Sequence, residues 1–221
     1  MTKLQYPIDK ILDYLTILLF FCIPPLFTTQ IQKTQISLEF SAMSILLYSA
    51  LIVFILWCID LKKYPQTFVF SKANLYLCLL LYINMFFWNG IGGKLGVESN
   101  QSLLLPTSLS GWLSCIIGTI VFASFEEILY RFFLPVRTKE LLHLVCNKEK
   151  IVTFLSEGIP LLLFTFAHRY LGLFPLLNSL FAGILLRYFY TKNKSIFWNS
   201  IIHSLYNFSI YFITFYGVLC K

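Results

Sequence analysis

Ionisable side chains inside apolar runs are the residues of this sequence that could do chemistry. Two adjacent glutamates, Glu126 and Glu127, lie deep in one such run, and Arg131 follows Glu127 by four residues. Residues four apart share a helix face, so Glu127 and Arg131 can pair, while Glu126 points about 100° away and lacks a partner on its own helix. A charge near the bilayer centre costs at least ~2.5–3.5 kcal/mol on insertion scales. Either a function or a purely structural sharing of Arg131 must therefore compensate for the two carboxylates.

Two histidines and an asparagine in other apolar runs extend this set. His168 closes one run, and His203 and Asn207 lie four apart in the last one. Each has a common structural alternative, as a hydrogen-bonded packing residue or as an interhelical polar pair. Together with Glu126 they could carry out acid–base chemistry. A carboxylate in a cavity of low dielectric constant is a competent general base for water, and histidine and amide N–H groups can stabilise an oxyanion. These parts suffice for amide hydrolysis without a serine or cysteine nucleophile.

Membrane helices must position these residues. The chain is 58% hydrophobic and 12% charged, against about 45–50% and about 25% in soluble domains. A bilayer core of about 30 Å needs about 20 mostly apolar residues per crossing, and backbone in lipid must be helical. Seven runs qualify: Ile11–Phe27, Phe40–Ile59, Asn74–Ile91, Gly111–Leu134, Ile151–Ala167, Leu171–Tyr190 and Ile196–Leu219. We predict an all-α, polytopic transmembrane helix bundle of about seven spans, with eight as the alternative, around a polar intramembrane cavity.

Basic residues between the runs predict the orientation. With a cytoplasmic N-terminus, most lysines and arginines fall in inside segments, which is the usual bias of membrane proteins. We therefore expect a multi-pass protein of the cell membrane, of the bacterial inner-membrane type, with its N-terminus inside. Lys3 and Lys10 precede the first run and Pro24-Pro25 follows it, which indicates an uncleaved signal anchor. The segment 151–187 must hold two spans and a turn, which predicts short or broken helices around His168.

Charge and cysteine usage exclude other classes of protein. The net charge is +7, but the basic residues occur in short clusters between apolar runs, which fits anionic lipid headgroups and predicts no nucleic-acid partner. The six cysteines form no C-x-x-C pair, so neither a disulfide framework nor a cysteine metal site is expected. The lipid bilayer is the expected surrounding.

The polar motifs, in their order along the chain, resemble the CAAX prenyl protease and bacteriocin-processing family of intramembrane peptidases. The sequence reads E-E-x-x-x-R at 126–131, F-x-x-x-H at 164–168 and H-x-x-x-N at 203–207. The resemblance covers residues 111–207. It implies a catalytic helical core over residues 111–221, preceded by three membrane spans in residues 1–110.

The resemblance also implies roles for the site residues. Glu126 would activate a water that His168 helps to hold, His203 and Asn207 would stabilise the oxyanion, and the Glu127–Arg131 pair would orient Glu126. The favoured interpretation needs no cofactor. The other keeps a divalent metal, such as zinc, on Glu126, His168 and His203, although the sequence has no H-E-x-x-H helix. The partner would be a peptide or protein substrate, because some members cut prenylated C-terminal motifs and others process peptides.

Two further functions stay open at this point. A non-catalytic immunity or partner-binding protein could use the same polar cavity for recognition. A small transporter could use Glu126 and Glu127 as a proton relay, although the sequence has no evident internal repeat of the kind that transporters commonly have.

Overall fold

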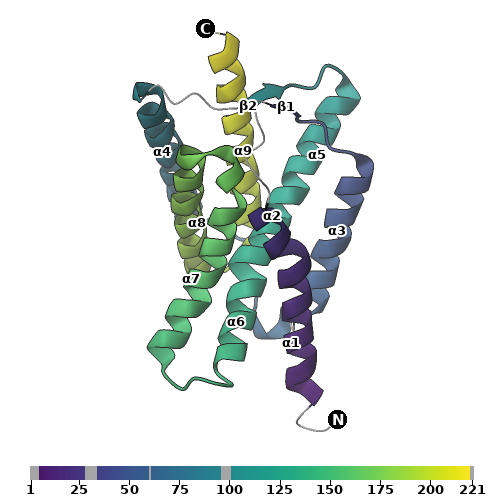
Figure 1. The fold of residues 1–221 in the computed structure, drawn as a ribbon, viewed down its shortest axis with the longest axis vertical. Coiled ribbons are helices and arrows are strands. Elements are labelled where there is room, and N and C mark those ends of the chain that lie inside the picture. The colour runs from purple at the N-terminus through teal and green to yellow at the C-terminus, as the bar shows by residue number, and fades with distance from the viewer. Residues whose placement is uncertain (1–4, 28–33, 60, 96–100, 220–221) are drawn as a thin grey trace.

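The computed structural model describes residues 5–27, 34–59, 61–95 and 101–219, and they form a bundle of long helices (Figure 1). In chain order the elements are α1 (Gln5–Ile17), η1 (Leu18–Cys22), α2 (Ile23–Phe27), β1 (Thr34–Ser37), α3 (Ala42–Trp57), η2 (Leu61–Lys63), α4 (Lys72–Lys94), β2 (Gln101–Leu104), α5 (Leu109–Glu126), η3 (Glu127–Phe133), α6 (Leu134–Leu142), α7 (Glu149–Ala167), η4 (Arg169–Leu171), α8 (Leu173–Asn193) and α9 (Ile196–Leu219). Each of the seven predicted runs is helical.

Five helical segments are long and apolar enough to cross a membrane: Ile8–Phe27, Lys72–Gly92, Leu109–Leu142, Glu149–Leu171 and Leu173–Asn193. The helix α3 is apolar but shorter, with 16 residues, and α9 has 24 residues. The prediction of an all-α, polytopic membrane bundle is confirmed. The start of α1 and the end of α9 lie at opposite ends of the molecule in Figure 1.

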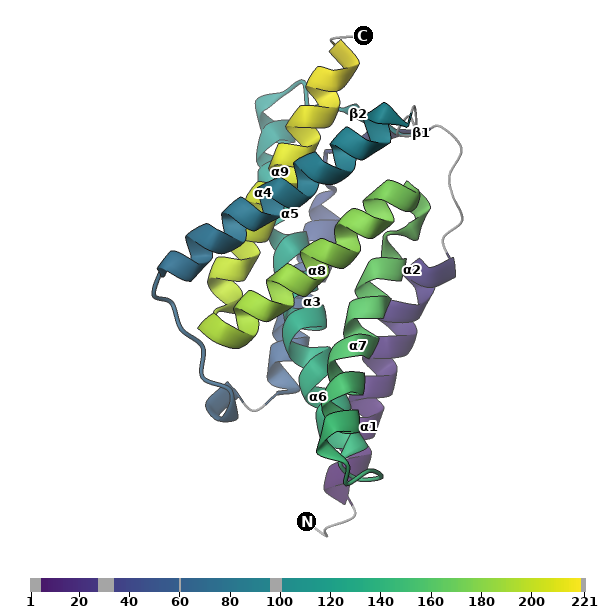
Figure 2. The same ribbon diagram turned by 90° about the vertical axis from the view of Figure 1, so that its left-hand side faces the viewer.

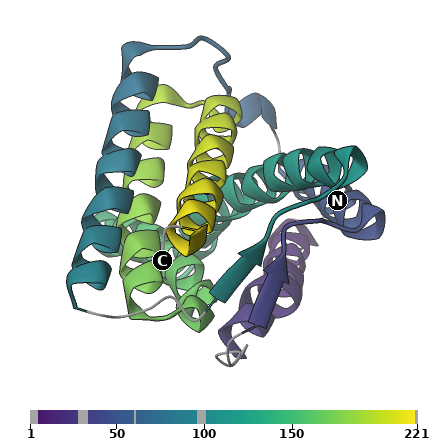
Figure 3. The same cartoon turned by 90° about the horizontal axis from the view of Figure 1, so that it is seen from above.

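The helices pack in two groups. Figure 3 shows α4, α8 and α9 on one side of the molecule and α1, α3 and α5 on the other. In the first group α4 runs beside α8 at a similar tilt (Figure 2), and Leu77, Leu81 and Met85 of α4 are buried against Leu186 and Tyr206. Helices from before and after residue 110 are thus interleaved, and a division of the chain at that position stays a prediction.

A short parallel pairing between β1 and β2 was not predicted. Thr34 pairs with Gln101 and Ser37 with Leu104, and the ladder brings the start of α3 beside the start of α5. The two segments lie between the apolar runs, where the sequence shows no strand-like alternation.

The hairpin of α7 and α8 corrects the expectation of short or broken helices. The two helices have 19 and 21 residues and are continuous, with Pro160 inside α7. They fit because the hairpin begins before residue 151 and extends to Asn193, beyond the limits taken from the apolar runs. Its turn ends at Gly172, whose φ of +108° is accessible mainly to glycine.

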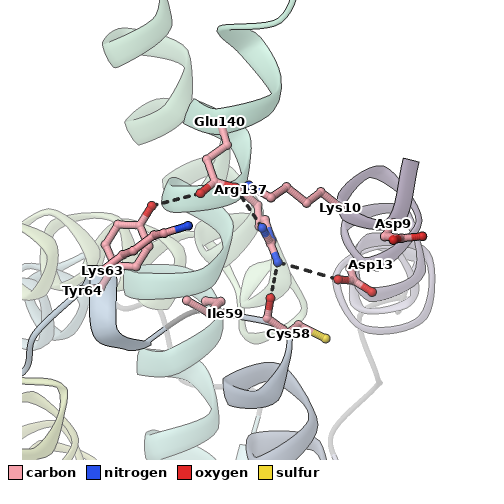
Figure 4. A pocket seen from close by; sticks show the side chains of 9 residues that line it. All are labelled: Asp9, Lys10, Asp13, Cys58, Ile59, Lys63, Tyr64, Arg137 and Glu140. Atoms are coloured by element: carbon pink, nitrogen blue, oxygen red, sulfur yellow. Dashed lines mark hydrogen bonds and ion pairs between the residues drawn. The ribbon is translucent and has the colours of Figure 1, made fainter. Parts of the chain in front are cut away.

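The segment Leu109–Leu142 is helical over 34 residues, which corresponds to about 51 Å at 1.5 Å per residue. That exceeds the bilayer core of about 30 Å, so one end must lie outside it. At the α6 end, Arg137 and Glu140 form a charged network with α1 (Figure 4). Lys10 Nζ lies 2.8 Å and Arg137 Nη1 2.9 Å from Glu140 Oε2, and Arg137 also contacts Asp13.

A cavity of about 210 Å³ adjoins this network. It is lined by the residues labelled in Figure 4: Asp9, Lys10, Asp13, Cys58, Ile59, Lys63, Tyr64, Arg137 and Glu140. The network ties α1 to α6 and to the segment that follows α3.

Candidate active site

The buried carboxylate of Glu127 is the anchor of the polar cluster. Its side chain is fully buried at the start of η3. Its Oε1 lies 3.7 Å from Arg131 Nε, so the pair predicted from the i, i+4 spacing is present. Oε1 also accepts a hydrogen bond from His203 Nδ1 at 2.9 Å. A carboxylate with these partners is acceptor-only, which makes it a fixed support for the imidazole.

His203 lies between the two adjacent glutamates. Its Nδ1 faces Glu127, and its Nε2 lies 3.6 Å from Glu126 Oε2. Because the Nδ1–H donates to Glu127, the second ring nitrogen is the one presented to Glu126. The side chain of His203 is 5% exposed and that of Glu126 is 26% exposed. Glu126 is therefore the carboxylate that an incoming group can reach, and Glu127 is the one enclosed by protein.

The backbone that carries this pair is a π-helix. In η3 the hydrogen bonds run to the fifth preceding residue, and the last of them joins the N–H of Leu134 to the carbonyl of Leu129. All seven residues of η3 are buried. Short π-helical turns are rare in proteins overall, but those that occur are often found at functional sites. Here the segment sets the register at which Glu127 and Arg131 leave the helix.

Phe164 connects the second motif to the first. The guanidinium of Arg131 lies 3.9 Å above the centre of its ring, and its carbonyl oxygen lies 2.8 Å from His168 Nδ1. The Phe164 ring lies 4.7 Å from the ring of His168 and 6.4 Å from that of His203. Since a carbonyl oxygen only accepts, Nδ1 of His168 carries the proton and Nε2 is the free nitrogen.

The structure brings the predicted residues together unequally. Glu126, Glu127, Arg131 and His203 interact directly. His168 lies at the end of α7, half-buried, and reaches the cluster through Phe164, with no hydrogen bond or ion pair to Glu126 or His203 among the described residues.

Asn207 lies one helical turn beyond His203 on α9 and is half-buried. Its amide forms no hydrogen bond within the part of the chain that the structure describes. The two donors of that amide are therefore available to another group on the same helix face as His203.

Asn199 is a site residue that the motif did not include. It is buried on α9, one turn before His203. Its Nδ2 donates to Glu127 Oε2 at 3.3 Å and to the Leu186 carbonyl at 2.9 Å. The signal that could have found it is the repeat of four that places Asn199, His203 and Asn207 on one helix face.

The donor set does not fit a resident metal ion. No three histidine, cysteine, aspartate or glutamate side chains among the described residues are placed to hold one. Glu126 and His203 face each other, but the third ligand considered from the sequence, His168, forms no hydrogen bond or ion pair with either of them among the described residues; its ring contacts Phe164. We derive no chemical step through a metal.

Comparison with known proteins gives one match. Residues 107–209 match the family model described as type II CAAX prenyl endopeptidase, Rce1-like. The matched segment contains all of the polar residues described above, from Glu126 to Asn207. No curated protein and no solved structure matches the chain.

Proposed function

Residues 107–209 belong to the Rce1-like family of type II CAAX prenyl endopeptidases, and from this premise we propose that Glu126 activates water for peptide-bond hydrolysis within the membrane. The family match supports a membrane protease that acts on peptide or protein substrates, and the apolar helices support a multi-pass membrane protein. The catalytic type, the residues and their roles are our proposal.

One observation carries this proposal. Glu126 Oε2 and His203 Nε2, from two different helices, face each other at 3.6 Å. That separation is longer than a hydrogen bond, and one water beside both atoms could contact each of them. Glu127 holds the other nitrogen of His203 at 2.9 Å, which fixes the orientation of the ring before substrate arrives. Orientation fixed in advance is what makes such donors effective in a transition state.

The reaction follows from these positions. The water oxygen attacks the scissile carbonyl carbon while Glu126 takes one of the water protons. The carbonyl oxygen becomes an oxyanion and accepts hydrogen bonds from His203, protonated at Nε2, and from the Asn207 amide. Collapse of the intermediate breaks the C–N bond, and Glu126 returns the proton to the leaving amine. His168 contributes by holding the water through its free Nε2.

A cleavage assay in proteoliposomes tests this mechanism. The probes are a peptide with a farnesylated C-terminal Cys-a-a-X motif, its unprenylated counterpart, and a mixed peptide library read by mass spectrometry. Glu126→Gln and His203→Ala should each lower the turnover about 10²–10⁴-fold, the range for loss of a general acid–base group. Glu149→Gln is the matched control, because Glu149 is a glutamate whose side chain is 61% exposed in a surface ion pair. It should retain full turnover.

The outcomes separate the alternatives. Cleavage retained in Glu126→Gln would contradict the mechanism. A wild-type protein that cuts none of the probes would favour the immunity or partner-binding function on the same scaffold. Activity that is lost to a chelator and restored by zinc would preserve the peptidase and overturn the metal-independent chemistry.

A further inference from the structure

A proline interrupts the backbone hydrogen bonds of the helix that carries the two glutamates. Pro135 follows η3 and has no N–H. In a regular α-helix the donor to the Arg131 carbonyl would be the N–H of residue 135, and in the π register the same N–H would serve Tyr130. Arg131 is 1% exposed and Tyr130 is 5% exposed, so water does not replace that donor freely. Buried carbonyl groups normally find a partner, and beside this proline a group from another helix can supply one.

Arg187 on α8 supplies that partner. Its Nη1 donates to the carbonyl oxygen of Arg131. Its Nε and Nη2 donate to the two carboxylate oxygens of Glu157 on α7, at 2.5 and 2.6 Å. The guanidinium is planar and rigid, so its two hydrogen bonds to Glu157 fix the direction in which Nη1 points. Three helical segments are thus joined at one side chain.

The hydrogen bond from Arg187 reaches the backbone of Arg131, a residue whose side chain belongs to the candidate active site. The backbone of Arg131 is held by Arg187, while its side chain pairs with Glu127 at 3.7 Å. Glu127 in turn orients His203. A shift of the η3 backbone would therefore move the carboxylate that holds the imidazole.

We propose that Arg187, oriented by Glu157, is a positioning residue that fixes the π-helical segment η3 and, through it, the Glu127–His203 pair. The proposal rests on the proposed function, because it names a support for that same site. Neither residue belongs to the three polar motifs, and neither forms a hydrogen bond or ion pair with Glu126 or His203 among the described residues.

An ordinary surface ion pair between α7 and α8 is the competing explanation. It would need only the charge of residue 187. The observed arrangement uses three separate N–H groups of the guanidinium, one of them on a backbone carbonyl. A lysine keeps the charge and can pair with Glu157, but its single nitrogen cannot reproduce the fork.

The test compares Arg187→Lys, Arg187→Met and Glu157→Gln in the full-length protein in proteoliposomes, with kcat and KM measured separately. Small displacements of a reacting geometry cost about 10²-fold in rate. Both Arg187 variants should lower kcat about 10–100-fold with KM within about twofold, and Glu157→Gln should have a smaller effect of the same kind. Lys139→Met is the control, because it removes a 2.7 Å ion pair between helix ends on the surface. It should leave kcat unchanged.

Pro135→Ala makes the test specific to the carbonyl. The alanine restores the missing N–H, so Arg187→Met in that background should cost at least fivefold less in kcat than it does beside Pro135. An equal cost in both backgrounds would overturn the proposal, and so would an Arg187→Lys variant with wild-type kcat.

A readout without turnover keeps the proposal separate from the proposed function. The ¹⁵N resonances of the His203 ring report the hydrogen bond from Nδ1 to Glu127. Arg187→Met should shift them and Lys139→Met should not. If the wild-type protein has no peptidase activity, that shift still supports the positioning of His203 by Arg187. Unchanged resonances in Arg187→Met would contradict the positioning of His203 by Arg187.

Discussion

The buried pair of Glu127 and Arg131 allows a quantitative test of how the site is held. Glu127→Gln keeps the size of the side chain and removes its charge. Arg131 is then left 1% exposed, with Nε and Nη2 lacking hydrogen bonds and the Phe164 ring at 3.9 Å. Removing one partner of a buried ion pair costs about 3–5 kcal/mol. At about 2–4 °C per kcal/mol for a chain of this size, the midpoint of thermal unfolding should fall by roughly 6–20 °C.

The double variant Glu127→Gln/Arg131→Met distinguishes support from catalysis. Replacing both charges with neutral groups of similar volume is often close to neutral for stability, so the double variant should recover at least about 2 kcal/mol relative to Glu127→Gln. Peptidase activity should not recover with it, since His203 still lacks a charged acceptor on Nδ1. The two-mutation cycle isolates the coupling between the partners.

The assay follows thermal unfolding in detergent by tryptophan fluorescence, beside cleavage in proteoliposomes. A double variant no more stable than Glu127→Gln would refute the buried-charge argument. A double variant that regained both stability and cleavage would show that the two residues only pack the helix.

Three further predictions concern packing, hydrogen bonding and orientation. A Cβ at Gly118 would overlap the ring of Phe40, so Gly118→Leu should cost about 1–3 kcal/mol of stability by overpacking; Gly158→Ala, where nothing lies within 4 Å, should be neutral or stabilising in the same thermal assay. Asn199→Ala removes a buried hydrogen bond to Glu127 and should lower stability by about 1–3 kcal/mol, measured as a loss in the unfolding midpoint; an unchanged midpoint would contradict the assigned contact. Alkaline phosphatase fused to the C-terminus should be active and the same enzyme fused to the N-terminus inactive, because the basic residues predict a cytoplasmic N-terminus; the reverse result would invert the orientation.

The helices could be predicted from sequence because apolar length alone specifies a membrane crossing. Long runs such as Asn74–Ile91 correspond to helices with small differences at their ends. The pairing of Glu127 with Arg131 was also predictable, since it depends only on a spacing of four within one helix. The limits of the α7–α8 hairpin were not, because a helix that continues beyond the bilayer no longer needs apolar residues.

The remaining parts of the site depend on contacts between distant segments. Arg187 and Glu157 look like ordinary charges in sequence, and their role appears only when α7 and α8 flank Pro135. The π-helical register of η3 has no sequence pattern that distinguishes it from the α-helical register on either side. His168 was expected beside the glutamates, but its ring contacts Phe164, which in turn lies near Arg131 and His203, an arrangement that no spacing rule specifies.

In the proposed mechanism, the length of the helix that contains Glu126 limits which peptides can be cut. Glu126 is near the midpoint of Leu109–Leu142, so about 25 Å of helix separates it from either end. An extended chain covers about 3.3 Å per residue, so a peptide that approaches along this helix must thread roughly eight residues before its scissile bond arrives. A tightly folded domain cannot supply an extended segment of that length, whereas an unfolded terminal segment can. Susceptibility to this enzyme should then depend on how much loose chain a protein presents as well as on the residues around the cut.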